Sequence, residues 1–188
     1  YAADLDQVAA KLDLRDSTLI GHSMGGMVAM VYAATYPGRM KKLVVVDTSI
    51  NLSEERLSAM RDVGNRGGSS YPSKEALLAR YKLRPGNSLA PLEIQHYIGG
   101  HSARQFPDGG WRHKFDRGVY GLREQMDGMP CWDRIKVPAL LVRADRSPRI
   151  TPEIHAAVKA RAPQVELRRE LVEIGGVVVI GVGRRVRP

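Results

Sequence analysis

The pattern with the clearest chemical meaning is Gly21-x-Ser23-x-Gly25. Residues 17–20 before it are typical of a short buried strand, and residues 27–34 after it are apolar on nearly every side, so the sequence predicts a strand, a sharp turn and a buried helix. Glycines on both sides of a serine remove the Cβ atoms that would collide in a strained turn exposing the hydroxyl. The spacing therefore predicts that Ser23 is a nucleophile. The alternative is a glycine-rich turn with an ordinary exposed serine.

The same turn predicts a site for a negatively charged oxygen. Met24 opens the predicted helix, where the first N–H groups have no partner within the helix and face the positive end of its dipole. The Met24 N–H could then donate to the oxyanion that forms when Ser23 attacks a carbonyl carbon. These residues together predict acyl transfer through a covalent serine intermediate.

A serine hydroxyl becomes a good nucleophile when a histidine accepts its proton and an acid orients that histidine. Asp145 is the predicted acid, because it follows the apolar stretch 137–142. It would lie at the carboxyl end of a strand, where parallel sheets place their chemistry. The alternative is a surface aspartate paired with Arg143 or Arg146.

The histidines do not supply an obvious base. His155 is the one histidine after Asp145, and we expect it inside a helix over 152–160. His22 adjoins the nucleophile and is expected to pack rather than to accept the serine proton. The remaining histidines precede the acid and belong to a polar central stretch: His96, His101 and His113.

The elements around these residues alternate. A helix over 5–12 and the strand and helix flanking Ser23 come first, and a β-branched strand over 43–46 follows. After the central stretch come the strand over 137–142 and the helix over 152–160. This alternation predicts an α/β fold with a mostly parallel sheet and flanking helices. We expect the core in 1–48 and 134–188.

The central stretch 49–133 does not follow the alternation. It is polar and rich in glycine and proline, and the aromatic residues along it include Tyr71, Tyr81, Tyr97, Phe106, Trp111, Phe115 and Tyr120. Short helices are expected over 53–63 and 73–81. We interpret the stretch as an insertion over the sheet.

The motif Ile20-Gly21-His22-Ser23-Met24-Gly25-Gly26 resembles the nucleophile elbow of the α/β-hydrolase superfamily, in its capped esterase and lipase branch. The similarity continues through 44–47 and 137–145 and covers residues 1 to 160. It implies a partial α/β-hydrolase fold with 49–133 as an inserted helical cap. It also implies Ser23 as nucleophile and Asp145 as acid, with Asp47 as the acid used by a minority of relatives.

The resemblance has two departures. The family's base follows the acid in a Gly-His context, which this chain lacks, and the strands that precede the elbow are also missing. The tail after residue 168 mixes valine, glycine and arginine, so we interpret it as a reading-frame change, with an unusual β-rich tail as the alternative. The chain is therefore expected to be a fragment. A serine at the elbow argues against haloalkane dehalogenase and epoxide hydrolase chemistry.

Composition excludes several classes of function. The net charge is +9, yet the basic residues are spread along the chain without interleaved aromatics, so no nucleic-acid partner is expected. The sequence has no apolar run long enough for a membrane span, and no signal peptide is expected. The single cysteine, Cys131, favours a reducing, cytoplasmic location and is expected to be a bystander thiol. No metal site and no cofactor are predicted.

The function that the sequence predicts is hydrolysis of an ester-like carbonyl compound through an acyl-enzyme. The alternative is a catalytically impaired relic of the same fold that binds a small apolar ligand or a protein. The motif does not separate esterases from carbon–carbon hydrolases or haloperoxidase-like enzymes, and substrate and oligomeric state stay open.

Overall fold

The structure is a computed structural model that describes residues 1–188 except 84–89, 145–146, 148, 171–180 and 183–188. The chain divides into two units. The first comprises Tyr1–Leu52 and the described residues from Met126 on, and the second comprises Ser53–Gln125. Most of the predicted tail lies outside the described residues, so the frame-change hypothesis stays a prediction.

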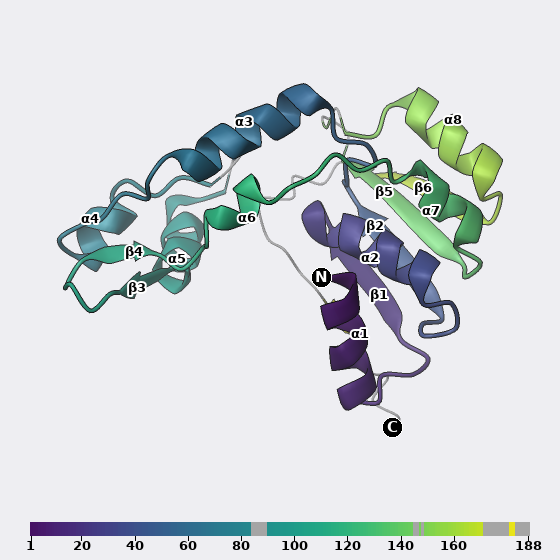
Figure 1. The fold of residues 1–188 in the computed structure, drawn as a ribbon, viewed down its shortest axis with the longest axis horizontal. Coiled ribbons are helices and arrows are strands. Elements are labelled where there is room, and N and C mark those ends of the chain that lie inside the picture. The colour runs from purple at the N-terminus through teal and green to yellow at the C-terminus, as the bar shows by residue number, and fades with distance from the viewer. Residues whose placement is uncertain (84–89, 145–146, 148, 171–180, 183–188) are drawn as a thin grey trace. The chain divides into compact units, whose positions relative to one another are not determined.

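A sheet in the order β6-β5-β2-β1-β7 forms the centre of the first unit (Figure 1). Its four longer strands run parallel to one another, and β7 pairs antiparallel with β1. The predicted α/β fold with a mostly parallel sheet is therefore confirmed. The strands are β1 (Thr18–His22), β2 (Lys42–Val46), β5 (Ala139–Ala144), β6 (Val165–Glu170) and β7 (Gly181–Val182).

The helices of the first unit are α1 (Ala2–Lys11), α2 (Met24–Thr35), α7 (Met129–Arg134) and α8 (Pro152–Arg161). Helix α2 packs on β1 and β2, and it is covered in turn by α1 and α7. This placement explains why α2 is apolar nearly all round, as a helix buried on several sides must be. The predicted helix after the turn is confirmed, and it ends at Thr35, shortly before Pro37.

The core of the first unit joins α2, α7 and the sheet. Trp132 of α7 and Met30 of α2 are fully buried, and they belong to the same cluster as Leu43, Val45 and Leu141 of the strands. Packing of this kind supplies most of the stability that keeps the carboxyl ends of the strands in register.

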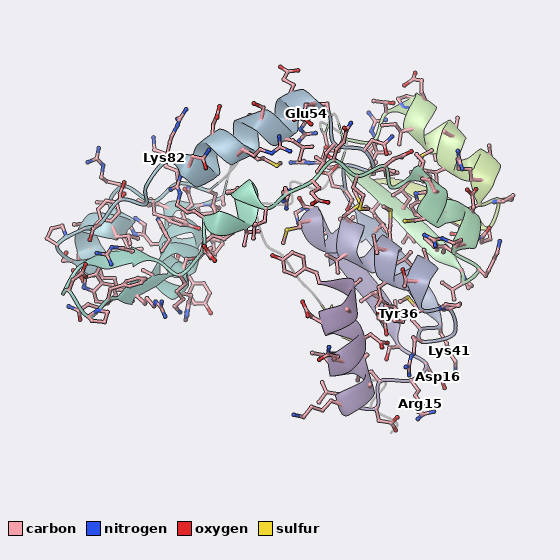
Figure 2. The ribbon with its side chains drawn as sticks, in the orientation of Figure 1. Arg15, Asp16, Tyr36, Lys41, Glu54 and Lys82 are labelled. Atoms are coloured by element: carbon pink, nitrogen blue, oxygen red, sulfur yellow. The ribbon has the colours of Figure 1, made fainter. Side chains whose placement is uncertain are left out.

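The opposite, amino-terminal ends of β1 and β2 are linked at the surface. Lys41 Nζ lies 3.0 Å from Asp16 Oδ2 (Figure 2). Both side chains are mostly exposed, so the pair contributes at most about 1 kcal/mol.

The second unit contains α3 (Glu54–Asn65), α4 (Lys74–Leu78), α5 (Leu92–Ser102), α6 (Gly118–Gly121) and an antiparallel hairpin, β3 (Ala103–Gln105) and β4 (Trp111–His113). The helices expected over 53–63 and 73–81 correspond to α3 and α4. Helix α5 and the hairpin were not expected. The role of 49–133 as a cap stays a prediction.

Serine side chains cap the first two of these helices. Ser53 and Ser73 each accept a hydrogen bond from the backbone N–H three residues on, at 3.3 and 3.1 Å. Such caps satisfy N–H groups that a helix start leaves unpaired, and each is worth about 1 kcal/mol. The cap residues therefore define where these helices begin.

Candidate active site

Ser23 lies in the turn between β1 and α2, with φ 52° and ψ −118°. A positive φ is strained for a serine, and such strain persists only where the surroundings impose it. Here the Ser23 N–H donates to Val46 O at 3.0 Å, and Ser23 O accepts from the N–H groups of Gly26 and Met27 at 3.1 and 3.2 Å. The neighbouring strand and the first turn of α2 thus hold Ser23 in this conformation.

Two glycines make room for this turn. A Cβ on Gly21 would lie 2.6 Å from the carbonyl carbon of Gly25 and 2.7 Å from Gly26 Cα, so the strand and the helix could not approach each other as they do. A Cβ on Gly26 would overlap Thr48 Oγ1. The close approach at Gly21 agrees with the reasoning from the motif. The requirement at Gly26 was missed, although the Gly25-Gly26 pair could have signalled it.

Thr48, two residues after the end of β2, supports the turn. Its side chain is 1% exposed, and Oγ1 donates to Val46 O at 3.1 Å. Val46 O is the acceptor of the Ser23 N–H as well. One backbone carbonyl therefore ties the nucleophile turn to the end of β2.

Met24 is the first residue of α2, and its side chain is partly exposed. Within the described part of the chain, no hydrogen-bond acceptor is found for its N–H, as is usual at a helix start. The Ser23 side chain makes no capping hydrogen bond either. The hydroxyl and an adjacent N–H are therefore both available to a reacting group.

Asp47 directly follows β2, beside this turn. It is 4% exposed and has φ 41°, another strained position, and its N–H donates to Val142 O of β5 at 2.8 Å. One carboxylate oxygen, Oδ2, accepts from Arg149 Nη1 at 2.6 Å. The other oxygen, Oδ1, is buried and has no partner among the described residues. A buried carboxylate oxygen without a donor is costly, so within the described residues Oδ1 is the acceptor of this carboxylate that is still open to a hydrogen bond.

Arg149 comes from the loop between β5 and α8. Its Nη1 also donates to Ser147 Oγ at 3.3 Å, and its side chain is 29% exposed. The guanidinium thus has one end in the pair with Asp47 and another part open to solvent.

His22 precedes the nucleophile at the end of β1, and its partner across the sheet is Val46. Burial lowers the pKa of His22, the charge of Asp47 opposes this shift, and the charge of Arg149 adds to it. Its Nδ1 is buried and has no partner among the described residues. His22 is therefore neutral near pH 7, as the lowered pKa requires.

The other predicted site residues are distributed differently. Asp145 lies outside the described residues, so its role stays a prediction. His155 is on α8, inside a helix as expected, and His96, His101 and His113 belong to the second unit. The structure therefore does not identify the base that the proposed chemistry needs.

Neither the single cysteine nor a metal ion has a place in the candidate site as far as the structure describes it. The Cys131 thiol is buried on α7, and burial raises its pKa, which disfavours the reactive thiolate. Among the described residues, no group of three or more metal-ligating side chains could hold an ion. No described helix is both long and apolar enough to cross a membrane.

Comparison with known proteins identifies the family to which this fold belongs. A family model described as alpha/beta hydrolase fold matches residues 1–176. The sn-1-specific diacylglycerol lipase ABHD11 of Danio rerio is 26% identical over 174 residues, which are 88% of this chain and 53% of that protein. Esterase YbfF of Escherichia coli is 25% identical over 171 residues, 87% of this chain and 61% of that protein.

A solved structure shows the same fold. The E-2-(acetamidomethylene)succinate hydrolase structure superposes with a TM-score of 0.72 at 23% identity, covering 90% of this chain and 63% of that one. The chain thus spans 53% and 61% of the length of the two curated relatives above.

Proposed function

The chain belongs to the α/β-hydrolase fold family, and we propose that the protein is a serine hydrolase that cleaves an ester-like carbonyl compound through an acyl-enzyme on Ser23. The observation that carries the proposal is the Ser23 turn, in which a strained serine stands between a parallel strand and the free N–H end of α2. Two of the relatives are named as a lipase and an esterase, which supports an ester bond as the target.

The proposed reaction has two stages. Ser23 Oγ attacks the carbonyl carbon while a histidine accepts the hydroxyl proton, and the carbonyl oxygen becomes an anion that accepts a hydrogen bond from the Met24 N–H. The anion collapses, the carbon–oxygen bond to the leaving alcohol breaks, and the alcohol takes the proton from the histidine. Water then attacks the acyl-serine by the same route and releases the acid. The substrate is a small molecule, and neither nucleic acid nor a cofactor takes part.

The acid of the triad has two candidates. Asp145 is the one expected from its position after the third parallel strand and from the family pattern. Asp47 has structural support, because it directly follows β2, the strand next to β1, and keeps a buried oxygen, Oδ1, without a donor among the described residues. An imidazole N–H is a donor of the kind that this oxygen lacks. We therefore propose Asp47 as the competing assignment.

The test of the function is hydrolysis of 4-nitrophenyl acetate. The chain is expected to release nitrophenolate faster than buffer, and Ser23→Ala is expected to remove this excess. Ser58→Ala, an exposed serine of α3, is the matched control and is expected to keep it. Equal rates for the chain and Ser23→Ala would refute the proposed nucleophile.

The acid is tested by a pair of variants in the same assay. Asp47→Asn and Asp145→Asn both keep the side-chain volume while removing the charge, and the acid is the position whose change lowers kcat by a factor of about 10⁴. Equal, small losses in both would contradict both assignments.

The second candidate function is a hydrolase-fold relic that binds an apolar ligand or a protein without chemistry. It is favoured by the histidines, since His22 is neutral and buried on one side and His155 lies on α8. Saturable binding of an apolar ester by a chain that does not hydrolyse 4-nitrophenyl acetate would select this reading. A cytoplasmic location remains part of both proposals.

A further inference from the structure

The feature that goes beyond the proposed hydrolysis is the unused part of the Arg149 guanidinium. A guanidinium has N–H donors on both of its long edges, and the edge formed by Nε and Nη2 fits one planar carboxylate. In this structure Nη1 makes the two contacts found for the group, to Asp47 Oδ2 at 2.6 Å and to Ser147 Oγ at 3.3 Å. Within the described part of the chain, Nε and Nη2 have no hydrogen-bond partner.

Two hydrogen bonds, to Asp47 and Ser147, hold the Arg149 side chain in place. The Asp47 side chain that holds it is 6% exposed, and Asp47 directly follows β2, a central strand of the sheet. Ser147 Oγ also accepts from the Arg149 backbone N–H at 3.3 Å, so Ser147 contacts both the backbone and the side chain of Arg149. Fixing the guanidinium in this way lowers the entropy that binding a ligand would otherwise cost.

The guanidinium lies close to the nucleophile turn. The charges of Asp47 and Arg149 both act on the imidazole of His22, the residue directly before Ser23. His22 and Asp47 end or follow adjacent strands at the carboxyl edge of the sheet, where α/β folds bind their ligands. A group bound to Arg149 would therefore be near the reacting carbonyl.

Charge decides which anion suits the site. The Asp47 carboxylate already offsets the single positive charge of Arg149, so a phosphate dianion would place two further negative charges beside it. A carboxylate adds one charge and matches the free Nε–Nη2 edge in shape. Apolar groups would leave these donors without a partner.

We propose that Arg149 is a substrate-binding residue that selects esters carrying a free carboxylate, and this rests on the proposed function. In this arrangement Asp47 fixes one end of the guanidinium, and the substrate carboxylate accepts hydrogen bonds from the other edge. The ester carbonyl of the same molecule then reaches Ser23.

The experiment measures binding without turnover. The Ser23→Ala chain is titrated with monomethyl succinate, which carries a carboxylate, and with dimethyl succinate, which does not. We expect the charged ester to bind about ten- to a hundredfold more tightly, the range for hydrogen bonds to a charged group. Equal binding of the two esters, or measurable binding of neither, overturns the proposal.

Variants connect the preference to Arg149. Arg149→Met in the same background is expected to abolish the preference. Arg161→Met is the matched control, because Arg161 makes the same Nη1–Oδ2 contact of 2.6 Å with Asp133 elsewhere in the unit, and it is expected to keep the preference. Since Arg149→Met leaves Asp47 unpaired, the double change Arg149→Met/Asp47→Asn removes both charges and protects the fold. A preference retained in either variant contradicts the proposal.

The outcome is separable from that of the proposed function. Hydrolysis of 4-nitrophenyl acetate by the unchanged chain, with no preference for the charged ester, leaves the hydrolase in place and removes the role of Arg149. A clear preference for the charged ester in a chain that does not hydrolyse 4-nitrophenyl acetate supports the role of Arg149 and removes the proposed hydrolysis.

Discussion

Replacing Gly26 by alanine tests how the nucleophile turn is held together. A Cβ at this position would overlap Thr48 Oγ1 and lie 3.0 Å from both Thr48 Cβ and Gly21 O. Thr48 cannot move aside without cost, because it is 1% exposed and its hydroxyl donates to Val46 O. Overpacking a site of this kind costs about 1–3 kcal/mol.

Part of that cost is offset. Alanine is favoured over glycine inside a helix by about 1 kcal/mol, and Gly26 lies in the first turn of α2. Because the overlap with Thr48 Oγ1 is severe, the upper part of that range applies, about 2–3 kcal/mol. With the offset, Gly26→Ala is expected to lower the free energy of unfolding by about 1–2 kcal/mol. Gly121→Ala is the matched control, since it ends α6 with no atom within 4 Å of the new Cβ, and it is expected to be neutral or stabilising.

A double-mutant cycle measured by urea unfolding attributes the effect to the contact. Thr48→Ala removes the overlapping hydroxyl, so Gly26→Ala is expected to cost less in that background, with a coupling energy of about 1 kcal/mol. If Gly26→Ala is as stable as the unchanged chain, or if the two changes are additive, the account of the turn is wrong.

Three further predictions concern other parts of the first unit. Because burial holds the pKa of His22 below its ordinary value of 6.5, the unfolded chain binds its proton more readily. His22 therefore favours the folded state above pH 6.5, and this contribution to stability is lost as the pH falls towards the lowered pKa. His22→Gln should reduce the loss of unfolding free energy between about pH 8 and about pH 5. An unchanged loss in this variant would contradict the role of His22. The buried Cys131 thiol should react with iodoacetamide much more slowly in the folded chain than in urea, and equal rates would show that it is accessible. Thr151 Oγ1 accepts from the Ile154 N–H at 3.3 Å, so Thr151→Ala should cost about 1 kcal/mol of unfolding free energy while Thr151→Ser keeps most of it; equal losses in the two would contradict a capping role.

The local patterns of the sequence predicted most of the first unit. The strands expected over 17–20 and 43–46 correspond to β1 and β2, and the Gly-x-Ser-x-Gly spacing identified the turn between β1 and α2. These features depend on neighbours in the sequence, so a short window carries enough information. Thr151 as the cap of α8 was predictable for the same reason.

The contacts that complete the candidate site could not be predicted in this way. Arg149 and Asp47 are 102 residues apart in the chain, and nothing in either local sequence indicates the other. The contact between Gly26 and Thr48 likewise depends on how α2 approaches the end of β2. Such contacts are set by the packing of the sheet rather than by local propensity.

The second unit was the least predictable part of the structure. Its hairpin pairs Arg104 with Arg112, so the strands lack the alternating apolar residues that signal a half-buried strand. Both guanidinium groups stack on Phe106, at 4.4 and 4.8 Å from the ring centroid. The glycine pair at 109–110, with Gly109 at φ 82°, was the signal from which the turn could have been inferred.

The most direct test of the central claim is covalent labelling of the chain with a fluorophosphonate, read by intact mass and by mapping the modified peptide. The strained turn and the free Met24 N–H lead us to expect a single adduct on Ser23, absent in Ser23→Ala and retained in Ser58→Ala. An adduct on another residue, or none under conditions where the chain is folded, would contradict the assignment of Ser23 as the nucleophile.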